Sequence, residues 1–353
     1  MKTQYALPHS NSFTKNIDGK NTHLFTLKNR AGMQIALTDY GARLVSALVP
    51  DKNGNLIDVV LGFDSIDGYI NAQEKYHGAT IGRFANRISN GTFRIDDKEY
   101  KLPINNGPNC LHGGPNGFHT KVWDRQVNFR KNVDFYYVSP DNEEGFPGSL
   151  NTIVKYELTD NNEIIINFKA TATQKTIVNL TNHAYFNLNG EGDENIYNHL
   201  IKINSEEFIE INDSQTPTGT KQNVKNTLFD FTKECSIGDR LNQTNDQLAK
   251  AQGYDHSFIN NNTLSQMAAS AFSPKTGIQL EVYTDYPTLH FYSSNFLSDD
   301  RGKSGKTYMK HGGFCFEAQH YIDNINQSNF PCIILEPGEE YNFNIIYRFS
   351  VKK

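Results

Sequence analysis

Histidines that stand beside glycine, amide and aromatic residues are the first sign of proton-transfer chemistry in this 353-residue chain. His112 precedes a Gly-Gly pair, His183 lies two residues before Tyr185, and His256 follows Asp255. Imidazole titrates near neutral pH, so each of these side chains could donate or accept a proton. Taken singly, each is also compatible with a half-buried structural histidine.

Glu317 interrupts an otherwise apolar strand pattern over 313–319. Because side chains alternate along a strand, Phe314 and Phe316 should share one face, and Cys315 and Glu317 the other. A carboxylate held among aromatic rings has a raised pKa and can act as a base. The alternative is a carboxylate on a solvated face, and the segment alone does not separate the two.

The segment 82–91 combines Arg83 and Arg87 with Asn86 and two glycines. Forked, charge-assisted hydrogen bonds from such a group suit the vicinal hydroxyls of a sugar. A surface turn with ion pairs would have the same composition. Both interpretations stay open at this point.

Metal, nucleotide and nucleophile motifs are missing from the sequence. It contains no HExxH, EF-hand loop, P-loop or GxGxxG opening a helix, so we predict neither a metal nor a cofactor. Cys110 lies two residues from His112, but this spacing is weak support for a Cys/His nucleophile. The lone Trp123 is predicted to lie in the core rather than to stack on a ligand.

Composition limits the partners and the compartment. A formal charge of −5 without a Lys/Arg patch argues against nucleic acid as a partner. No leader-like segment and no apolar run of about 18 residues is present, so we expect a cytoplasmic protein without a membrane partner. The four cysteines stand singly, which fits reduced thiols. The sequence does not decide between a monomer and a homodimer.

The elements that must hold these groups are predicted to be short strands separated by polar turns. We expect strands over 44–49, 57–61, 92–95, 100–102, 153–156, 164–168, 278–283, 289–292, 314–316, 332–335 and 341–347. Helical periodicity is scarce, and the best short candidates are 241–251 and 264–271. The pattern predicts an all-β fold, a large antiparallel β-sandwich with few short helices. No linker or composition shift marks a boundary, so residues 1–353 are expected to form a single domain.

Taken in order, eight segments make the chain resemble the galactose mutarotase (aldose 1-epimerase) family over nearly its whole length. Each segment is short, and their order is what makes the likeness specific. They are Asp39-Tyr-Gly-Ala-Arg-Leu, Gly82-Arg-Phe-Ala-Asn-Arg-Ile, Asn109-Cys-Leu-His-Gly-Gly, Ser139-Pro-Asp-Asn-Glu-Glu-Gly-Phe-Pro-Gly, Thr181-Asn-His-Ala-Tyr-Phe-Asn-Leu, Asp255-His256, Phe316-Glu-Ala-Gln and Pro337-Gly-Glu-Glu-Tyr.

The resemblance implies a β-sandwich, here of the mutarotase supersandwich type, whose concave face holds one pyranose. It implies an aldose 1-epimerase that exchanges the α and β anomers of galactose, glucose or another free aldose, with Glu317 as general base and His183 as general acid. The sugar-binding positions implied by the family fall on Asn86, Arg87, His112, Tyr185 and Asp255. His290 stands where the family would have a sugar-contacting Gln, which puts the sugar preference in doubt.

Three other functions compete with this interpretation. Glu317 with Asp255 or Asp285 could form the carboxylate pair of a glycoside hydrolase. A hexose-phosphate mutarotase would need an additional cationic pocket that the sequence does not locate. A catalytically silent sugar-binding module could keep the fold without the chemistry, although the presence of both Glu317 and His183 argues against it.

Overall fold

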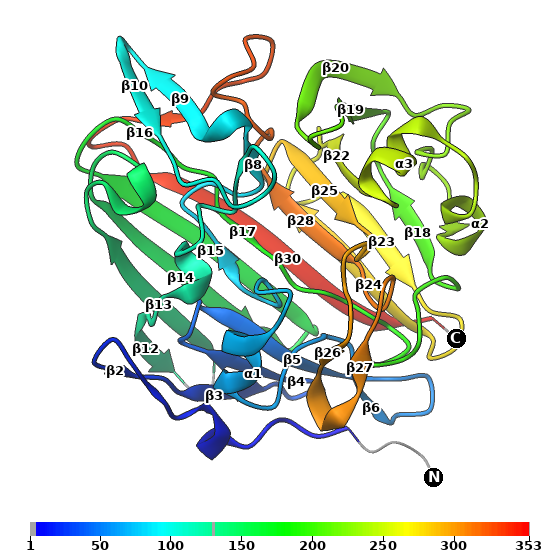
Figure 1. The fold of residues 1–353 in the computed structure, drawn as a ribbon. Coiled ribbons are helices and arrows are strands. Elements are labelled where there is room, and N and C mark those ends of the chain that lie inside the picture. The colour runs from blue at the N-terminus through cyan, green and yellow to red at the C-terminus, as the bar shows by residue number, and fades with distance from the viewer. Residues whose placement is uncertain (1–4, 129–130, 353) are drawn as a thin grey trace.

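Antiparallel sheets form most of the chain in the computed structural model, which describes residues 5–128 and 131–352 (Figure 1). What we call the large sheet runs in the order β12 (Asp124–Asn128), β13 (Asn132–Ser139), β14 (Leu150–Leu158), β15 (Glu163–Ala172), β30 (Tyr341–Val351), β24 (Ile278–Thr284), β23 (Ala269–Phe272), β18 (Leu200–Ile203) and β21 (Cys235–Ser236). The cavity sheet runs β20 (Pro217–Asn223), β19 (Glu207–Ile211), β22 (Asp255–Ile259), β25 (Thr288–Tyr292) and β28 (Cys315–Gln319). The N-terminal sheet runs β3 (Leu24–Lys28), β4 (Gln34–Thr38), β5 (Arg43–Pro50) and β6 (Leu56–Asp58).

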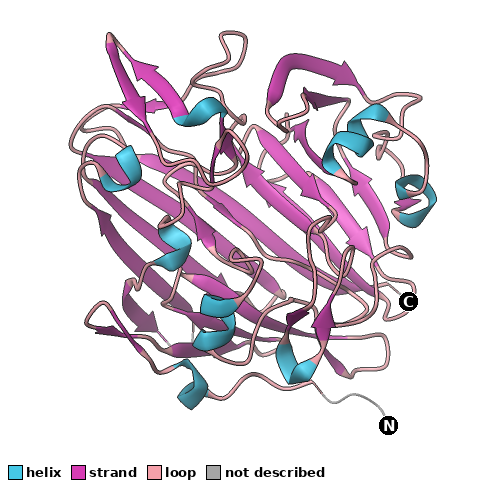
Figure 2. Ribbon diagram, in the orientation of Figure 1, coloured by secondary structure: helices cyan, strands magenta, loops and turns pink. Residues whose placement is uncertain are grey.

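Small strand pairs and short helices connect these sheets (Figure 2). The pairs are β1 (Asn16–Ile17) with β2 (Lys20–Asn21), β7 (Thr80–Ile81) with β17 (Thr181–Asn182), β8 (Arg87–Ile88) with β11 (Cys110–Leu111), β9 (Thr92–Ile95) with β10 (Lys98–Lys101), β16 (Thr176–Ile177) with β29 (Ile334–Leu335), and β26 (Asp300–Arg301) with β27 (Thr307–Tyr308). The α-helices are α1 (Ile66–Asn71), α2 (Gly238–Leu241) and α3 (Asp246–Ala251). Single 3₁₀ turns occur at Ser10–Phe13, Ser89–Gly91, Phe118–Thr120, Glu143–Gly145 and Lys303–Gly305. The predicted all-β class with few helices is confirmed.

The large sheet shows the alternation expected of strands with one face in the core. Along β14 and β15, buried residues alternate with more exposed ones, and the two strands pair from Leu150 with Ala172 to Leu158 with Ile164. The polar turn between them closes where the Thr159 N–H donates to the Glu163 carbonyl. The strands predicted over 153–156 and 164–168 are therefore confirmed.

The core lies where side chains of the large sheet meet those of the other two sheets. Phe25 of β3 packs on Phe135 of β13 with ring centroids 6.1 Å apart. The Tyr347 hydroxyl of β30 donates to the Phe316 carbonyl of β28 at 3.0 Å. Trp123 is fully buried in the same core, as predicted. Burial of aromatic rings on this scale supplies much of the stabilising apolar area.

Three adjacent strands of the cavity sheet differ from the strands of the large sheet, because every residue of β22, β25 and β28 is buried. Phe291 and Phe316 point into the core, with ring centroids 5.4 Å apart. Residues on the opposite face, such as Cys315 and Glu317, are equally buried although they are not part of that core. The predicted division of the segment 314–317 between two faces is confirmed, and the polar face is covered by loops instead of open solvent.

The two helix candidates have different outcomes. The segment 241–251 contains the end of α2 and the whole of α3, whose cap Asn245 accepts N–H bonds from Gln247 and Leu248. The helix predicted over 264–271 is wrong, because its C-terminal part enters β23, which pairs with β18 and β24 in the large sheet. Small residues permit a helix at this point, but ladder pairing on both sides overrides that weak preference.

No helix within residues 5–128 and 131–352 is long and apolar enough to cross a membrane. The four cysteines, which all lie in the described residues, are unpaired. The cytoplasmic location stays a prediction.

Candidate active site

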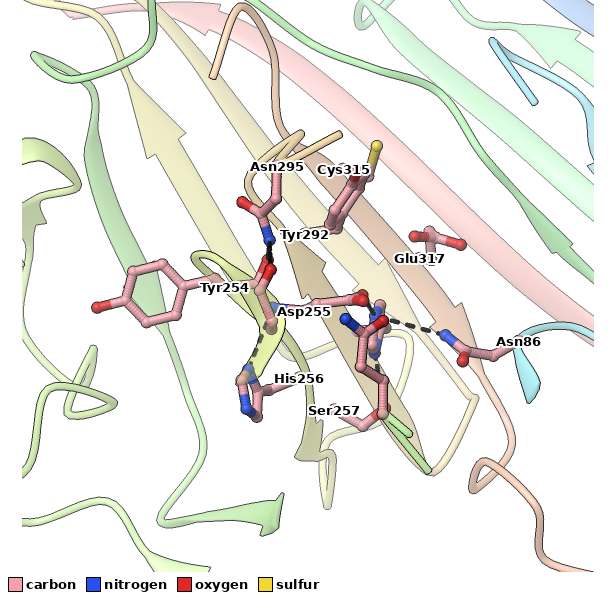
Figure 3. A network of polar contacts seen from close by, with 12 residues as sticks. Asn86, Tyr254, Asp255, His256, Ser257, Tyr292, Asn295, Cys315 and Glu317 are labelled. Carbon is pink, nitrogen blue, oxygen red and sulfur yellow. Dashed lines mark hydrogen bonds and ion pairs between the residues drawn. The ribbon is translucent and has the colours of Figure 1, made fainter. Parts of the chain in front are cut away.

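Three neighbouring strands form the floor of a polar cavity (Figure 3). The antiparallel register places Ser257, His290 and Glu317 in one row across β22, β25 and β28. The next row holds Asp255, Tyr292 and Cys315. Because side chains two residues apart share a face of a strand, the two rows point the same way, away from the aromatic core.

The walls of this cavity, which has a volume of about 510 Å³, come from loops far apart in the sequence. They include the segments 73–76, 86–87, 105–108 and 213–215. The eight residues singled out from the sequence all line it: Asn86, Arg87, His112, His183, Tyr185, Asp255, His290 and Glu317. The fold therefore brings the complete set together, while their individual roles stay predictions.

Glu317 and His183 are two buried titratable groups that face each other across the cavity. His183 Nε2 lies 3.7 Å from Glu317 Oε1, and both side chains are almost fully buried. Burial lowers the pKa of His183 to about 3. Burial, together with the nearby carboxylates of Asp255 and Glu74, raises the pKa of Glu317 well above its usual range.

These two pKa shifts mean that the pair holds one proton between its members. Burial favours the neutral form, a carboxylic acid beside a neutral imidazole. The ion pair, carboxylate with imidazolium, contains the same number of protons, so a proton shift within the pair is enough to form it. The second carboxylate oxygen of Glu317 has no hydrogen-bond partner among the described residues.

Asp255 anchors a charged network at the other end of the floor. Its Oδ1 lies 2.6 Å from His290 Nε2, and its Oδ2 lies 3.4 Å from Arg87 Nη1. Although burial alone would raise the pKa of Asp255, Arg87 and His290 outweigh it and lower that pKa. Asp255 is therefore a fixed carboxylate. Asn86 joins the network through its amide nitrogen, 3.4 Å from His290 Nε2.

Arg87 is held mostly by protein acceptors. Its Nε donates to Asn106 at 2.9 Å, and its terminal nitrogens reach Gln215, Asp255 and the Asn86 amide oxygen. This arrangement fixes the guanidinium as part of the wall and leaves little of its hydrogen-bonding capacity for a ligand.

His112 contributes a second imidazole close to the Glu317 and His183 pair. Its ring centroid lies 5.1 Å from that of His183, and its Nδ1 accepts the backbone N–H of Asn86 at 3.1 Å. A neutral imidazole that accepts at Nδ1 carries its proton on Nε2, so His112 is a hydrogen-bond donor on that side.

Ligating atoms of His112, His183 and Glu317 lie within 4.8 Å of one another, which is the spacing of a candidate metal site. A metal ligand needs a free nitrogen lone pair, and the bond from the Asn86 N–H occupies the Nδ1 lone pair of His112. The donor form of His112 suits a hydrogen-bond acceptor better than a metal ion. That no metal takes part stays a prediction.

Several residues considered at the sequence level lie outside this arrangement. Arg83 is buried and donates to the Ser139 hydroxyl and to the carbonyls of residues 139, 140, 147 and 148, so its role is structural. The His256 ring packs on Phe229 in the core, with centroids 4.7 Å apart. Asp285 accepts hydrogen bonds from the backbone and side chain of Asn344 and does not line the cavity.

The sequence analysis missed part of the wall, including Glu74, Tyr76 and Tyr292. Tyr76 packs against His112 at 4.5 Å and stacks on His183 at 5.8 Å between ring centroids. The string Tyr76-His77-Gly78 joins an aromatic, a histidine and a glycine, which is the composition that drew attention to the other histidines. Nothing comparable marks Glu74.

Comparisons with known proteins agree with this arrangement. The sequence profile of the aldose 1-epimerase family matches residues 23–348. The galactose mutarotase of Bos taurus is 43% identical over 321 residues, covering 90% of this chain and 92% of that protein. The aldose 1-epimerase of Escherichia coli is 37% identical over 337 residues, covering 94% and 96%.

Solved structures are similar over the same length. The aldose epimerase homologue from C. elegans superposes with a TM-score of 0.88 at 33% identity, covering 94% of this chain and all of that one. The galactose 1-epimerase from Lactobacillus acidophilus gives a TM-score of 0.84 at 29% identity, with 96% and 97% coverage. Because its sequence and its fold both match over most of its length, this chain belongs to the aldose 1-epimerase family.

Proposed function

We propose that this protein is a mutarotase that interconverts the α and β anomers of a free aldose, with Glu317 as general base and His183 as general acid. The observation that carries the assignment is the buried pair itself, with 3.7 Å between nitrogen and oxygen in a cavity large enough for a pyranose. Galactose is the first sugar to test, since the relatives at 41–43% identity are named galactose mutarotases.

The reaction needs two proton transfers at neighbouring atoms of the sugar ring. Glu317 takes the proton of the C1 hydroxyl while His183 gives a proton to the ring oxygen, and the ring opens to the aldehyde. Rotation about the C1–C2 bond presents the other carbonyl face. Reclosure with the two roles reversed gives the other anomer, so the enzyme returns to its starting protonation state without redox chemistry or a covalent intermediate.

Burial of the pair favours ring opening in this scheme. The reaction starts from carboxylate and imidazolium and reaches carboxylic acid and neutral imidazole in the open-chain state. Burial stabilises the second arrangement, as the directions of both pKa shifts indicate. Hydroxyl groups of the bound sugar hydrogen-bond the ion pair and make its formation possible on binding.

The surrounding residues position the sugar in this proposal. His112 donates a hydrogen bond on the ring-oxygen side, and Asp255 accepts one from a hydroxyl away from C1. His290 and Arg87 hold Asp255 in place. Tyr185 stacks its ring on His183, 4.9 Å between centroids, and limits the movement of the acid. Since the walls come from residues 73 to 215 and the floor from residues 255 to 317, we propose that the chain works as one catalytic domain.

A glycoside hydrolase that pairs Glu317 with Asp255 or Asp285 is less well supported by the geometry. It requires a second carboxyl group that can exchange a proton or attack the anomeric carbon. Asp285 lies outside the cavity, and Asp255 is bound to Arg87 and His290.

Freshly dissolved α-galactose, followed by optical rotation, gives the direct test of the proposal. We expect the protein to speed relaxation to the same final rotation as buffer alone, in proportion to its concentration. An aryl galactoside tested in parallel should release no sugar. A rate equal to that of buffer with galactose, glucose and other free aldoses would leave a silent binding module as the better description.

The pH dependence of kcat/KM should follow the protonation state of the Glu317 and His183 pair, which is active when the pair holds one proton. The pair gains a second proton only near the lowered pKa of His183, about 3, and loses its proton only above the raised pKa of Glu317. We therefore expect a broad plateau through mildly acid and neutral pH, with an alkaline decline. The profile is measured from rates that are corrected for spontaneous mutarotation at each pH. A decline in kcat/KM centred near pH 4.5 on the acid side would contradict this prediction.

A further inference from the structure

The loop 73–76, which lines the cavity, is held by hydrogen bonds to an aspartate that is far away in the sequence. Asp300 Oδ1 accepts the backbone N–H of Gln73 at 2.8 Å, and its Oδ2 accepts that of Glu74 at 3.1 Å. Asp300 itself is buried. This double anchor fixes the backbone at Glu74, so the direction in which its side chain enters the cavity wall is set by the fold.

The carboxylate of Glu74 lacks a strong partner. It accepts the backbone N–H of Tyr76 at 3.2 Å and forms no ion pair within the described part of the chain. Burial raises the pKa of Glu74 to about 7; the neighbouring Tyr185 hydroxyl offsets part of this rise. That hydroxyl is buried and forms no well-oriented hydrogen bond with any described residue. The carboxyl group of Glu74 and the neighbouring hydroxyl of Tyr185 can therefore both form further hydrogen bonds.

The cavity wall offers little positive charge to an anionic ligand. Arg87 is directed to Asp255, Gln215 and Asn106. The ammonium group of Lys75 donates to the Ile70 carbonyl at 2.6 Å and is exposed. Lys75 is therefore a cation of the described wall without a carboxylate partner, but solvent screens its exposed charge, whereas an ionised Glu74 repels an anionic group on a ligand.

We infer that Glu74 determines substrate specificity: with the Tyr185 hydroxyl it binds a hydroxyl group of the sugar, and it discriminates against aldoses that carry a negative charge. This inference rests on the proposed function for the identity of the ligand. It assigns the cavity to neutral aldoses over uronic acids and sugar phosphates, and it ties that preference to one side chain outside the acid/base pair.

Binding of a neutral and an anionic sugar to matched variants tests the inference. The probes are 1,5-anhydro-D-galactitol, which has no anomeric hydroxyl and cannot mutarotate, and D-galacturonate, each titrated by calorimetry at pH 8, where Glu74 is mostly ionised. The variants are Glu74→Gln and, as control, Asp213→Asn, which removes an exposed rim carboxylate and changes the net charge equally. Glu74→Ser repeats the charge removal if Glu74→Gln lowers the melting temperature.

Wild type should prefer the neutral probe, and Glu74→Gln should reduce that preference about tenfold or more, because like charges in a partly desolvated site repel strongly. Asp213→Asn should leave the ratio within about twofold, since solvent screens an exposed charge. An unchanged ratio in Glu74→Gln, or equal changes in both variants, would overturn the inference. Polarimetry of wild type with galactose reports catalysis separately, so a protein that shows the Glu74 effect but no rate enhancement would refute only the proposed reaction.

Discussion

Glu317→Gln and His183→Asn should each lower kcat for anomer exchange by about 10²–10⁴-fold, the usual contribution of a well-placed proton-transfer group. Glutamine keeps the size of glutamate but cannot take the C1 proton, and asparagine cannot give one to the ring oxygen. Binding of 1,5-anhydro-D-galactitol should change far less, because neither group is the main anchor of the sugar in the proposed arrangement. Polarimetry gives kcat, and calorimetry gives the dissociation constant.

The control for this experiment is Glu340→Gln, the same chemical change at an exposed ion pair with Lys169. It should leave kcat unchanged. The double variant should lose little more than the worse single variant, since the two groups act as a unit. Single variants that retain more than a tenth of the wild-type kcat would show that other residues carry the proton transfers.

Acidification from pH 7 to pH 4 should lower the melting temperature markedly. Burial lowers the pKa of eight histidines: His77, His112, His119, His183, His199, His256, His311 and His320. Their unfolded pKa is about 6.5. As pH falls below that value, the unfolded chain takes up protons that the folded chain refuses, so stability is lost between about pH 6.5 and the folded pKa values, about 3 to 4 where a value is resolved.

Buried carboxyl groups with raised pKa oppose this effect above about pH 4. Glu317, Glu74, Asp39, Glu191 and Asp323 hold protons in the folded state that the unfolded chain releases. The histidines outnumber these carboxyl groups, so the net slope stays positive with rising pH. Below about pH 4 the carboxyl groups are protonated in the unfolded chain too, and the loss of stability steepens.

A single substitution can isolate the contribution of one histidine to the pH dependence of stability. His320 packs among Tyr286, Tyr341 and Phe343, and its Nε2 is buried without a partner in the described residues. His320→Phe should therefore flatten the slope of stability with pH by about 1.4 kcal/mol per pH unit between pH 6 and 4. His9→Gln, at an exposed position, should leave it unchanged. Denaturant titrations at each pH supply the free energies; equal slopes in wild type and His320→Phe would contradict the account.

The sequence was sufficient for the fold class because the hairpins are local. Alternation and polar turns indicated β14, β15, β24, β25 and β30, and the structure contains each of them. The false helix over 264–271 shows where local reasoning ends, because β23 is a strand only through its pairing with β18 and β24. Such pairings join residues far apart in the sequence and leave no mark on a short window.

The candidate site also contains residues that the sequence indicates locally and residues that it does not. Glu317 stood out because a carboxylate in an apolar strand is a local anomaly, and the structure places it on the cavity floor. Glu74 lies in the polar segment Gln73-Glu74-Lys75-Tyr76, whose composition is typical of an exposed loop. Its position depends on Asp300, 226 residues later in the chain. Arg83 and Arg87 look alike in the sequence, yet only Arg87 faces the cavity.

The contrast between floor and walls determines where this protein can be re-engineered. Each floor residue shares its strand with core aromatics, so inserting or deleting one residue in β25 would turn His290 and Tyr292 into the core and Phe291 into the cavity. The wall segments 73–76, 105–108 and 213–215 carry no such coupling of register. Library designs that seek a new sugar preference should vary the length and composition of 105–108 and 213–215, and should leave the strands and Tyr76 unchanged, because Tyr76 stacks on His183.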